Sequence, residues 1–236
     1  MKKNTAEKLI LKTGKDYDLI ARKFSLTRNY LWDEMKKLLK LVNDGDRVLD
    51  FGCGSGRIAD ALIERKKGID YSGVDVSGKI IQEARKKHPN LFFFTLKEPF
   101  YTLPFDDNYF NVVFAIAVFH HIPSGDIRKK TVCELKRVLK KDGLIIVSVW
   151  SPPFKKLIYP FIKYTFLKFI GKIDMDIGDV FIPWKNSKGE VVAERYVHFF
   201  SKGGLRGLFG KNAFSILRSY YADSRRNIYL IGKKDG

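Results

Sequence analysis

From residue 47 onward, short apolar runs alternate with longer charged segments in which apolar residues recur every three or four positions. Short apolar runs are typical of buried strands, and the wider spacing is typical of helices. Their alternation predicts an α/β fold with a doubly wound, mostly parallel sheet that carries helices on both faces. The predicted strands are 47–51, 69–74, 91–95, 111–116 and 144–149, and the predicted helices between them are 57–66, 78–87 and 125–140.

The flanking regions complete one domain over residues 1–236. Two helices, 17–24 and 30–41, are expected within an N-terminal helical cap at residues 1–46. Residues 140–143 read Lys-Lys-Asp-Gly, a basic stretch ending in glycine that favours the end of a helix. Strands at 213–220 and 226–232 are expected to close the sheet, which makes it seven-stranded.

An insertion over residues 151–182 follows the fifth strand. It begins Ser-Pro-Pro and continues with aromatic residues among lysines over 154–170. At about 100° per residue, this segment has an apolar face and a basic face. The apolar face holds Leu157, Ile158, Phe161, Ile162 and Phe169, and the basic face holds Lys155, Lys156 and Lys163. The helix then packs on the domain, lies on a membrane or closes over a substrate, and packing is the commonest use of such a face.

The net charge of the chain indicates which classes of binding partner it favours. The chain has 44 Lys and Arg against 26 Asp and Glu, a net charge of +18, and half of the excess lies after residue 150. Such an excess favours a polyanion, either nucleic acid or acidic lipid headgroups, although charge that only maintains solubility is the alternative. Two cysteines and four histidines exclude a disulfide framework and a structural zinc cluster and fit a reducing, cytoplasmic compartment. No apolar run suits export or the ~20 residues of a membrane span.

The first strand leads directly into a glycine-rich turn. Asp50-Phe51 is followed by Gly52-Cys53-Gly54-Ser55-Gly56 and then by a helix. Alternate glycines before a helix let backbone N–H groups approach a ligand closely. The spacing differs from the Gly-x-Gly-x-x-Gly of dinucleotide sites, which disfavours a nicotinamide cofactor. Asp75 ends the next strand, where a carboxylate can accept hydrogen bonds from ribose hydroxyls.

These residues, with Leu103-Pro104-Phe105 and Lys141-Asp142-Gly143-Leu144, resemble the class I S-adenosylmethionine-dependent methyltransferases. The resemblance implies a Rossmann-like sheet and S-adenosylmethionine as the cofactor, with no metal. Cofactor-binding roles are implied for Tyr17, Asp50, Gly52, Gly54, Gly56, Asp75, Leu96 and Ala117. The acidic residue that the family often has after the third strand is displaced here to Glu98.

Longer strings resemble the tRNA wobble-uridine carboxymethyl methyltransferases. They are Tyr17–Ala21, Phe24–Arg28, Ala115–Ile122, Val149-Trp150, Asp179–Trp184, Arg195–Phe200 and Arg226–Tyr229. The resemblance implies esterification of the carboxylate of 5-carboxymethyluridine at the wobble position. It also implies the tRNA anticodon loop as substrate and a small zinc-binding activator subunit. The third strand, with Phe92, Phe93 and Phe94, is a candidate edge for this subunit, although burial in the core is the commoner role of such residues.

The chemistry needs a positioned cation more than a base. A carboxylate is already ionised at pH 7, so an arginine that grips it is the expected catalytic group. Arg28 is the first candidate, with His120 second; His120 and His121 either contact the substrate or pack beneath the cofactor. Further substrate contacts are expected from Trp184, Arg195, Arg226 and Asn227, because anticodon bases stack on aromatics and phosphates meet cations.

Two other functions fit the sequence. The aromatic and basic insertion also suits a methyltransferase of a small molecule or quinone at a membrane surface. A tRNA-binding module that keeps the fold without turnover is the third reading, against which the complete glycine turn and Asp75 argue.

Overall fold

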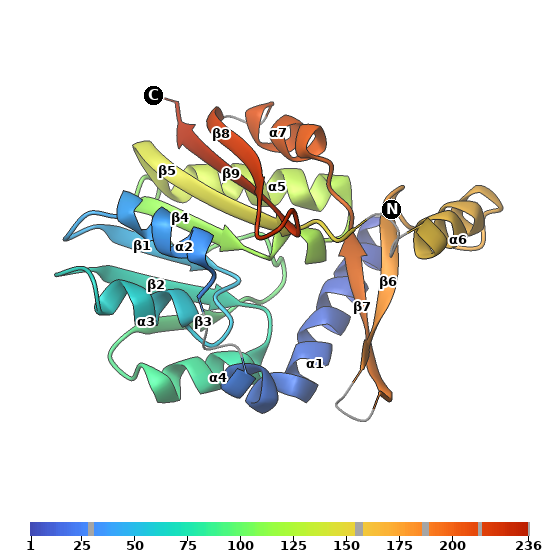
Figure 1. Ribbon diagram of the computed structural model, residues 1–236, viewed down its shortest axis with the longest axis horizontal. Helices are drawn as coiled ribbons and strands as arrows, with labels where there is room; N and C mark the ends of the chain where they lie inside the picture. The colour runs from blue at the N-terminus through green and yellow to red at the C-terminus, as the bar shows by residue number, and fades with distance from the viewer. Residues whose placement is uncertain (28–30, 154–157, 186–188, 212–213, 236) are drawn as a thin grey trace.

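The computed structural model describes the backbone of residues 1–27, 31–153, 158–185, 189–211 and 214–235. A seven-stranded sheet forms its centre, with strand order β3-β2-β1-β4-β5-β9-β8 (Figure 1). Strands β3, β2, β1, β4 and β5 pair in parallel, and β9 runs antiparallel to both β5 and β8, so the predicted mostly parallel fold is confirmed. The strands are β1 Arg47–Phe51, β2 Asp70–Asp75, β3 Phe92–Thr95, β4 Phe110–Ile116, β5 Leu139–Trp150, β8 Phe214–Ala222 and β9 Asn227–Lys234.

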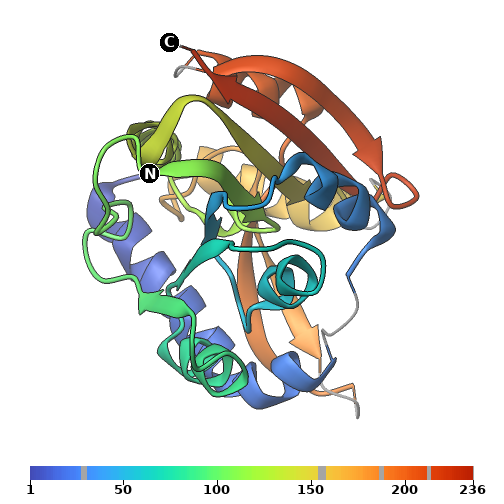
Figure 2. The same ribbon diagram turned by 90° about the vertical axis from the view of Figure 1, so that its left-hand side faces the viewer.

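Helices cover both faces of this sheet, which twists along its width as Figure 2 shows. One apolar cluster joins Leu135 and Phe209, from helices on one face, to Phe110 and Val113 of β4. The other cluster lies on the opposite face and includes Met35 and Leu62. The helices of the sheet region are α2 Asp33–Leu38, the 3-10 turn η1 Leu39–Leu41, α3 Arg57–Ile63, α4 Gly78–Lys87, α5 Gly125–Val138 and α7 Lys202–Gly210.

The N-terminal region differs from the expected pair of helices. Residues 17–24 belong to one long helix, α1, which spans Lys3–Thr27 and packs against α4. Its Asp18 accepts hydrogen bonds from the Ser77 hydroxyl, at 2.6 Å, and from the Lys79 backbone N–H, at 3.0 Å. These bonds attach α1 to the start of α4, beside the end of β2. The expected helix at 30–41 is reduced to α2 and η1, and its first residue lies outside the described residues.

The third predicted helix ends earlier than its basic stop. Helix α5 ends at Val138, and Leu139 already pairs with Phe110 as the first residue of β5. Asp142 has a left-handed φ of 61°, so the Lys-Lys-Asp-Gly stretch bends the start of the strand and does not end the helix. Gly143 fits there because a Cβ would lie 2.8 Å from the Leu139 side chain.

The region after Trp150 contains a helix and a hairpin. Helix α6 spans Ile158–Phe169, inside the expected insertion, and projects from the body of the molecule (Figure 1). Strands β6 Asp179–Lys185 and β7 Val191–His198 form a separate antiparallel pair, which the sequence did not predict. Among the described residues, no helix is both long and apolar enough to cross a membrane.

Candidate functional site

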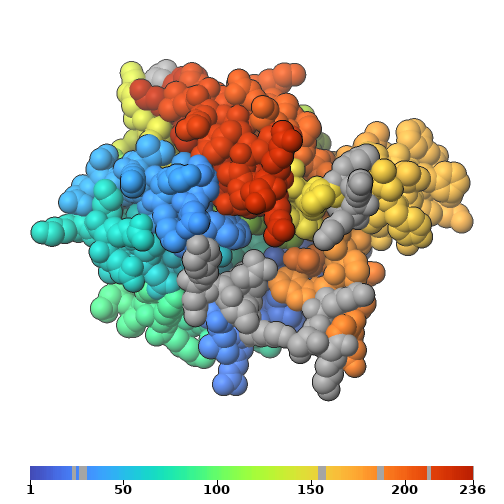
Figure 3. Space-filling view, viewed as in Figure 1, coloured from blue at the N-terminus to red at the C-terminus, as the bar shows by residue number. Residues whose placement is uncertain are grey.

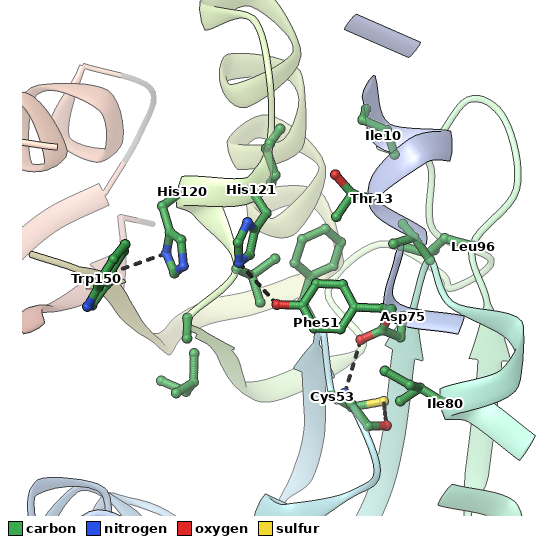
Figure 4. A pocket seen from close by; sticks show the side chains of 18 of the residues that line it. Ile10, Thr13, Phe51, Cys53, Asp75, Ile80, Leu96, His120, His121 and Trp150 are labelled. Atoms are coloured by element: carbon green, nitrogen blue, oxygen red, sulfur yellow. Dashed lines mark hydrogen bonds between the residues drawn. The ribbon is translucent and has the colours of Figure 1, made fainter. Parts of the chain in front are cut away.

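A cavity of about 380 Å³ opens at the carboxyl ends of β1, β2 and β4. Its walls come from the glycine-rich turn, the ends of β2 and β4, helix α1 and strand β7. In Figure 4, His120 and His121 lie on one side of it, and Ile10, Thr13 and Leu96 lie on the other. Parallel sheets bind ligands at the carboxyl ends of their strands, at the point where the strand order changes direction. In this sheet that point lies between β1 and β4.

The turn after β1 depends on glycine at Gly52. Its φ of 77° is in the left-handed region, and a Cβ there would lie 2.1 Å from Val118 Cγ2. Its N–H donates to the Val74 carbonyl at 2.7 Å, which fixes the turn against β2. The turn therefore leaves no room for a side chain, and the backbone of Gly52 and Gly54 forms part of the cavity wall.

Asp75 lies at the end of β2 and also lines the cavity. One carboxylate oxygen accepts the Gly54 N–H at 3.0 Å and the other accepts the Ser77 N–H at 3.0 Å. Burial raises its pKa, while these backbone hydrogen bonds act in the opposite direction. Each oxygen keeps a second lone pair, so the carboxylate can still accept two hydroxyl groups of a ligand.

Asp50 acts beneath the turn and does not line the cavity. It is buried and accepts a hydrogen bond of 2.8 Å from the Tyr71 hydroxyl. Burial raises the pKa of Asp50 to about 7, and the Tyr71 hydrogen bond and the charge of Arg57 oppose that rise. The resemblance implies that Asp50 orders the turn, and its hydrogen bond with Tyr71 ties β1 to β2 beneath that turn.

Ala117 follows β4 with a left-handed φ of 59°, which is uncommon for a residue with a Cβ. Its N–H lies 2.9 Å from the Ser148 carbonyl and 3.1 Å from the Ser148 hydroxyl, and these acceptors hold the strained bend. Ala117 lines the cavity beside the glycine turn, since the next residue, Val118, lies against Gly52. Backbone strain of this kind is often kept where a strand end forms a binding site.

His120 and His121 form the 3-10 turn η2, Phe119–His121, just after Ala117. His121 Nδ1 lies 2.8 Å from the Tyr196 carbonyl, so it carries the proton and leaves Nε2 to accept the Tyr17 hydroxyl at 3.2 Å. Burial lowers the pKa of His121 to about 4. His120 accepts the Trp150 backbone N–H at 3.3 Å, and burial lowers its pKa as well, with His121 and Arg195 adding to the shift. Both rings are therefore neutral at pH 7.

Tyr17 and Arg195 bring two distant segments to the cavity. The Tyr17 ring lies 5.8 Å from His121 and 5.9 Å from Trp184, both edge to face. The Arg195 guanidinium lies 4.3 Å over the Trp184 ring and lines the cavity. The long helix α1 and the β6–β7 hairpin thus meet in one aromatic and cationic cluster at its mouth.

The remaining expected site residues divide into several groups. Leu96 and Asn227 line the cavity, and Asn227 donates to Asp223 Oδ2 at 2.8 Å. Gly56, which precedes the first residue of α3, does not line it. A Cβ on Gly56 would point toward the side chains of His88 and Phe93. Arg226 is exposed and is also absent from the wall, as is Trp184 itself. Arg28 lies outside the described residues.

Several wall residues were missed from the sequence. Ile10 and Thr13 come from the part of α1 that was not predicted to be helical, and Val197 comes from the unpredicted hairpin. Trp32 also lines the cavity, with the Arg57 guanidinium 4.5 Å over its ring. The spacing of Ile10, Thr13 and Tyr17 at three and four residues was the available signal, because it places them on one helix face.

The cavity fits the cofactor that the resemblance implies. Its volume is within the roughly 300–1,000 Å³ common for small-molecule sites. Asp75 offers acceptors for ribose hydroxyls, and the neighbouring Ile80, Leu96 and Phe100 give an apolar wall for a flat base. The described residues contain no group of three or more His, Cys, Asp or Glu side chains placed to hold a metal ion.

Comparisons with known proteins relate the chain to methyltransferases. Residues 49–147 match the family model described as a methyltransferase domain. An Arabidopsis thaliana tRNA (carboxymethyluridine(34)-5-O)-methyltransferase is 30% identical over 57% of this chain, which spans only 31% of that protein. The protein of the same name from Schizosaccharomyces pombe is 28% identical over 93% of this chain and 94% of its own length. A Thermotoga maritima demethylmenaquinone methyltransferase is 28% identical over 72% of this chain and 73% of its own.

Solved structures show the same fold. A Methanosarcina mazei S-adenosylmethionine-dependent methyltransferase superposes with a TM-score of 0.69 at 20% identity, covering 87% of this chain and 98% of that one. A Haloferax volcanii methyltransferase, solved in a complex with the Trm112 methyltransferase activator, also gives 0.69 at 19% identity, covering 95% and 98%. Both likenesses are of fold, and they extend over nearly the whole of each solved chain.

Proposed function

We propose that this class I methyltransferase, whose cofactor is S-adenosylmethionine, modifies tRNA by esterifying the carboxylate of 5-carboxymethyluridine at the wobble position. The matched domain, the fold and the cavity support the cofactor and the reaction class. The Schizosaccharomyces pombe relative, similar over nearly the whole of both chains, supports the tRNA substrate.

The observation that carries the proposal is that the described wall residues provide no effective base at the substrate side of the cavity. Among its described wall residues the only carboxylate is Asp75, which already holds two backbone N–H groups. His121, with a pKa lowered to about 4, is a poor proton acceptor at neutral pH. Methylation of a hydroxyl or of a protonated amine requires loss of a proton, whereas an ionised carboxylate has none to lose.

The residues of this chain then act by placement. The bound cofactor would supply a methyl group on a positively charged sulfur. Arg195 is positioned to hold the substrate carboxylate, since a guanidinium pairs two oxygens at once. The neutral His120 ring can donate to the same group or stack on the uracil. Correct placement alone supplies roughly 7–11 kcal/mol of barrier lowering in favourable cases.

Arg28 is the second proposed carboxylate contact, by its position in the motif that resembles the tRNA family. Replacing Arg28 with Ala should lower turnover on modified tRNA at least tenfold and leave cofactor affinity within a few-fold. Arg22→Ala, at an exposed position of α1, is the matched control and should change neither quantity. Loss of cofactor binding in the Arg28 variant would instead place that residue at the cofactor.

The deciding experiment is mass spectrometry of nucleosides from tRNA incubated with the protein and isotopically labelled cofactor. The expected product is the methyl ester of 5-carboxymethyluridine, and mild alkali should remove its label. A label that resists alkali or lies on another nucleoside would contradict the proposal. If the tRNA acquires no label, two functions are left, namely the tRNA-binding module that lacks turnover and a methyltransferase of a small molecule.

A small activator subunit is part of the proposal. Strand β3 is an edge of the sheet, and Phe92 on it is 65% exposed and stacks on Phe94 at 6.0 Å. Phe93 is buried and belongs to the core. The Haloferax volcanii neighbour, solved with the Trm112 activator, supports a small activator partner. The zinc-binding character of this partner and its place beside β3 rest on the resemblance to the tRNA family. We expect the chain expressed alone to be poorly soluble or weakly active, and full activity of the purified lone chain would refute this.

A lipophilic small molecule or quinone is the second candidate substrate, motivated by the Thermotoga maritima relative. Methylation at a ring carbon of such a molecule must release a proton from that carbon, which the cavity wall is poorly equipped to accept. Incubation with demethylated quinones in detergent, in parallel with tRNA, separates the two substrates.

A further inference from the structure

Helix α6 stands apart from the rest of the fold. In Figure 1 and in the space-filling view of Figure 3 it projects from the body beyond the β6–β7 hairpin. It is held by one side: the Tyr164 ring lies 5.9 Å from Phe181 of β6, and Lys168 Nζ donates to the Met175 carbonyl. No residue of α6 belongs to the wall of the cavity.

The outward side of α6 is apolar. Four large side chains spaced three or four residues apart are mostly exposed: Tyr159 at 74%, Ile162 at 62%, Phe166 at 61% and Phe169 at 75%. At 100° per residue they fall in a single arc of the helix surface. Most amphipathic helices turn such a face to the core, whereas here the opposite side makes the contacts. Contiguous exposed apolar surface of this kind normally marks an interaction site.

The sequence of the segment that carries this face has charges of one sign only. Residues 151–173 contain five lysines, at 155, 156, 163, 168 and 172, and no aspartate or glutamate. Lys163 lies at the margin of the apolar arc and is exposed, as is Lys172 after the helix. The partner must therefore accept apolar side chains and bring negative charge to the same place.

We propose that α6 docks this protein onto the surface of an anionic lipid membrane, with Tyr159, Ile162, Phe166 and Phe169 inserted among the acyl chains. Aromatic and aliphatic side chains with flanking lysines are the composition of helices that lie in a membrane interface. If a second copy of the chain packed its own α6 on this face, the lysines of the two copies would lie close together and repel each other. RNA would meet the lysines but leave the apolar arc in water. The inference goes beyond the proposed function, because α6 is separate from the cavity and leaves it open.

The experiment uses the full chain and sedimentation with sucrose-loaded vesicles. Vesicles of phosphatidylcholine with phosphatidylglycerol should bind the protein, and vesicles of phosphatidylcholine alone should bind it at least tenfold more weakly, because lysines near a surface are attracted to anionic lipid. The variant Ile162→Ser with Phe166→Ser should weaken binding to the anionic vesicles at least tenfold.

Leu19→Ser with Leu217→Ser is the matched control, since these leucines are 72% and 58% exposed on α1 and β8. It removes equal apolar surface elsewhere and should bind vesicles as the wild type does. Both double variants should bind the cofactor with unchanged affinity, which shows that they are folded.

Equal vesicle binding by the wild type and the α6 variant would overturn the proposal, as would no binding by the wild type. A wild-type dimer that the α6 variant converts to a monomer would assign the face to a second copy instead. Loss of tRNA binding with the α6 variant, without loss of vesicle binding, would assign it to RNA. Failure to methylate tRNA with intact vesicle binding would affect only the proposed function.

Discussion

At the scale of single residues, Gly52 shows how one missing side chain shapes the cavity. Gly52 and Gly45 have nearly the same backbone conformation, with φ of 77° and 78°, but only Gly52 has neighbours in the way of a Cβ. A Cβ at Gly45 would meet nothing within 4 Å. Alanine variants at these two positions therefore distinguish two contributions to the loss of stability. One is the strain of a left-handed alanine, and the other is the collision of its Cβ with Val118.

Gly52→Ala should lose at least tenfold in cofactor affinity and unfold more easily by about 2–4 kcal/mol, because both backbone strain and overpacking act on it. Gly45→Ala should lose only about 1–2 kcal/mol and bind the cofactor normally. Isothermal titration with S-adenosylhomocysteine and urea unfolding measure the two effects. Equal losses in the two variants would show that the Val118 contact has no consequence.

His121 makes stability depend on pH. Its pKa is lowered to about 4 by burial, whereas in the unfolded chain it is about 6.5, so below pH 6.5 the unfolded chain takes up the proton first. Its contribution to stability is full above about pH 6.5 and is lost as pH falls toward 4. Asp50, whose pKa is raised to about 7, has the opposite slope, with stability falling as pH rises from about 4 to 7.

Comparison with His121→Asn isolates the histidine. The advantage of the wild type over this variant in free energy of unfolding should shrink by about 2–3 kcal/mol between about pH 7.5 and pH 4.5. Urea denaturation across that range gives the difference directly. A constant difference would mean that His121 is not held neutral in the folded protein.

Local chemistry was predictable from the sequence at this scale, and distant contacts were not. The glycine turn and Asp75 could be identified because each lies at the end of a predicted strand, where the apolar run stops. The state of His121 depends on the Tyr196 carbonyl, 75 residues further along the chain. No spacing in the sequence encodes that hydrogen bond, since it requires the hairpin to lie over the end of β4.

At the scale of elements, Asp176 joins the loop after α6 to the start of α5. It accepts the Gly125 N–H at 2.9 Å and pairs with Arg128 at 3.2 Å, and Arg128 is only 5% exposed. Burial acts to raise the pKa of Asp176, but the hydrogen bonds and positive charges around the carboxylate outweigh it, so the pKa is lowered. The contact fixes the loop that connects α6 to the hairpin.

Asp176→Ala should destabilise the protein by about 2–4 kcal/mol, because it leaves a buried arginine without its carboxylate. The nearby Asp174, whose side chain is 39% exposed, is the matched control. Asp174→Ala should cost less than about 1 kcal/mol, as exposed pairs usually do. Thermal unfolding of both variants tests this, and equal losses would contradict the role given to Asp176.

The elements missed from the sequence share a physical reason. Helix α7 contains Gly203, Gly204, Gly207 and Gly210, which disfavour a helix, and it forms because Leu205 and Phe209 are fully buried. Strand β6 contains Pro183, and proline disfavours a strand unless it is an edge strand, as β6 is. In both, tertiary packing overrides local preference, whereas the central strands were found because their own pattern is sufficient.

At the scale of the whole molecule, the excess of positive charge should govern binding to tRNA. A net charge of +18 attracts the phosphate backbone and releases counterions, so affinity should fall steeply with salt. Between about 50 and 200 mM salt, we expect a loss of at least about tenfold, measured by filter binding with labelled tRNA. Affinity that does not change with salt would show that the charge serves only solubility.

The cavity wall is assembled from both halves of the chain. Tyr17 belongs to α1, whereas Arg195 and Val197 belong to β7, and between them the chain forms five strands of the central sheet. During synthesis on the ribosome, a nascent chain that ends before residue 197 would hold the glycine turn and Asp75 but lack the wall that β7 supplies. Tight cofactor capture would then begin only after the hairpin has emerged, so the methyl donor would be bound late in synthesis.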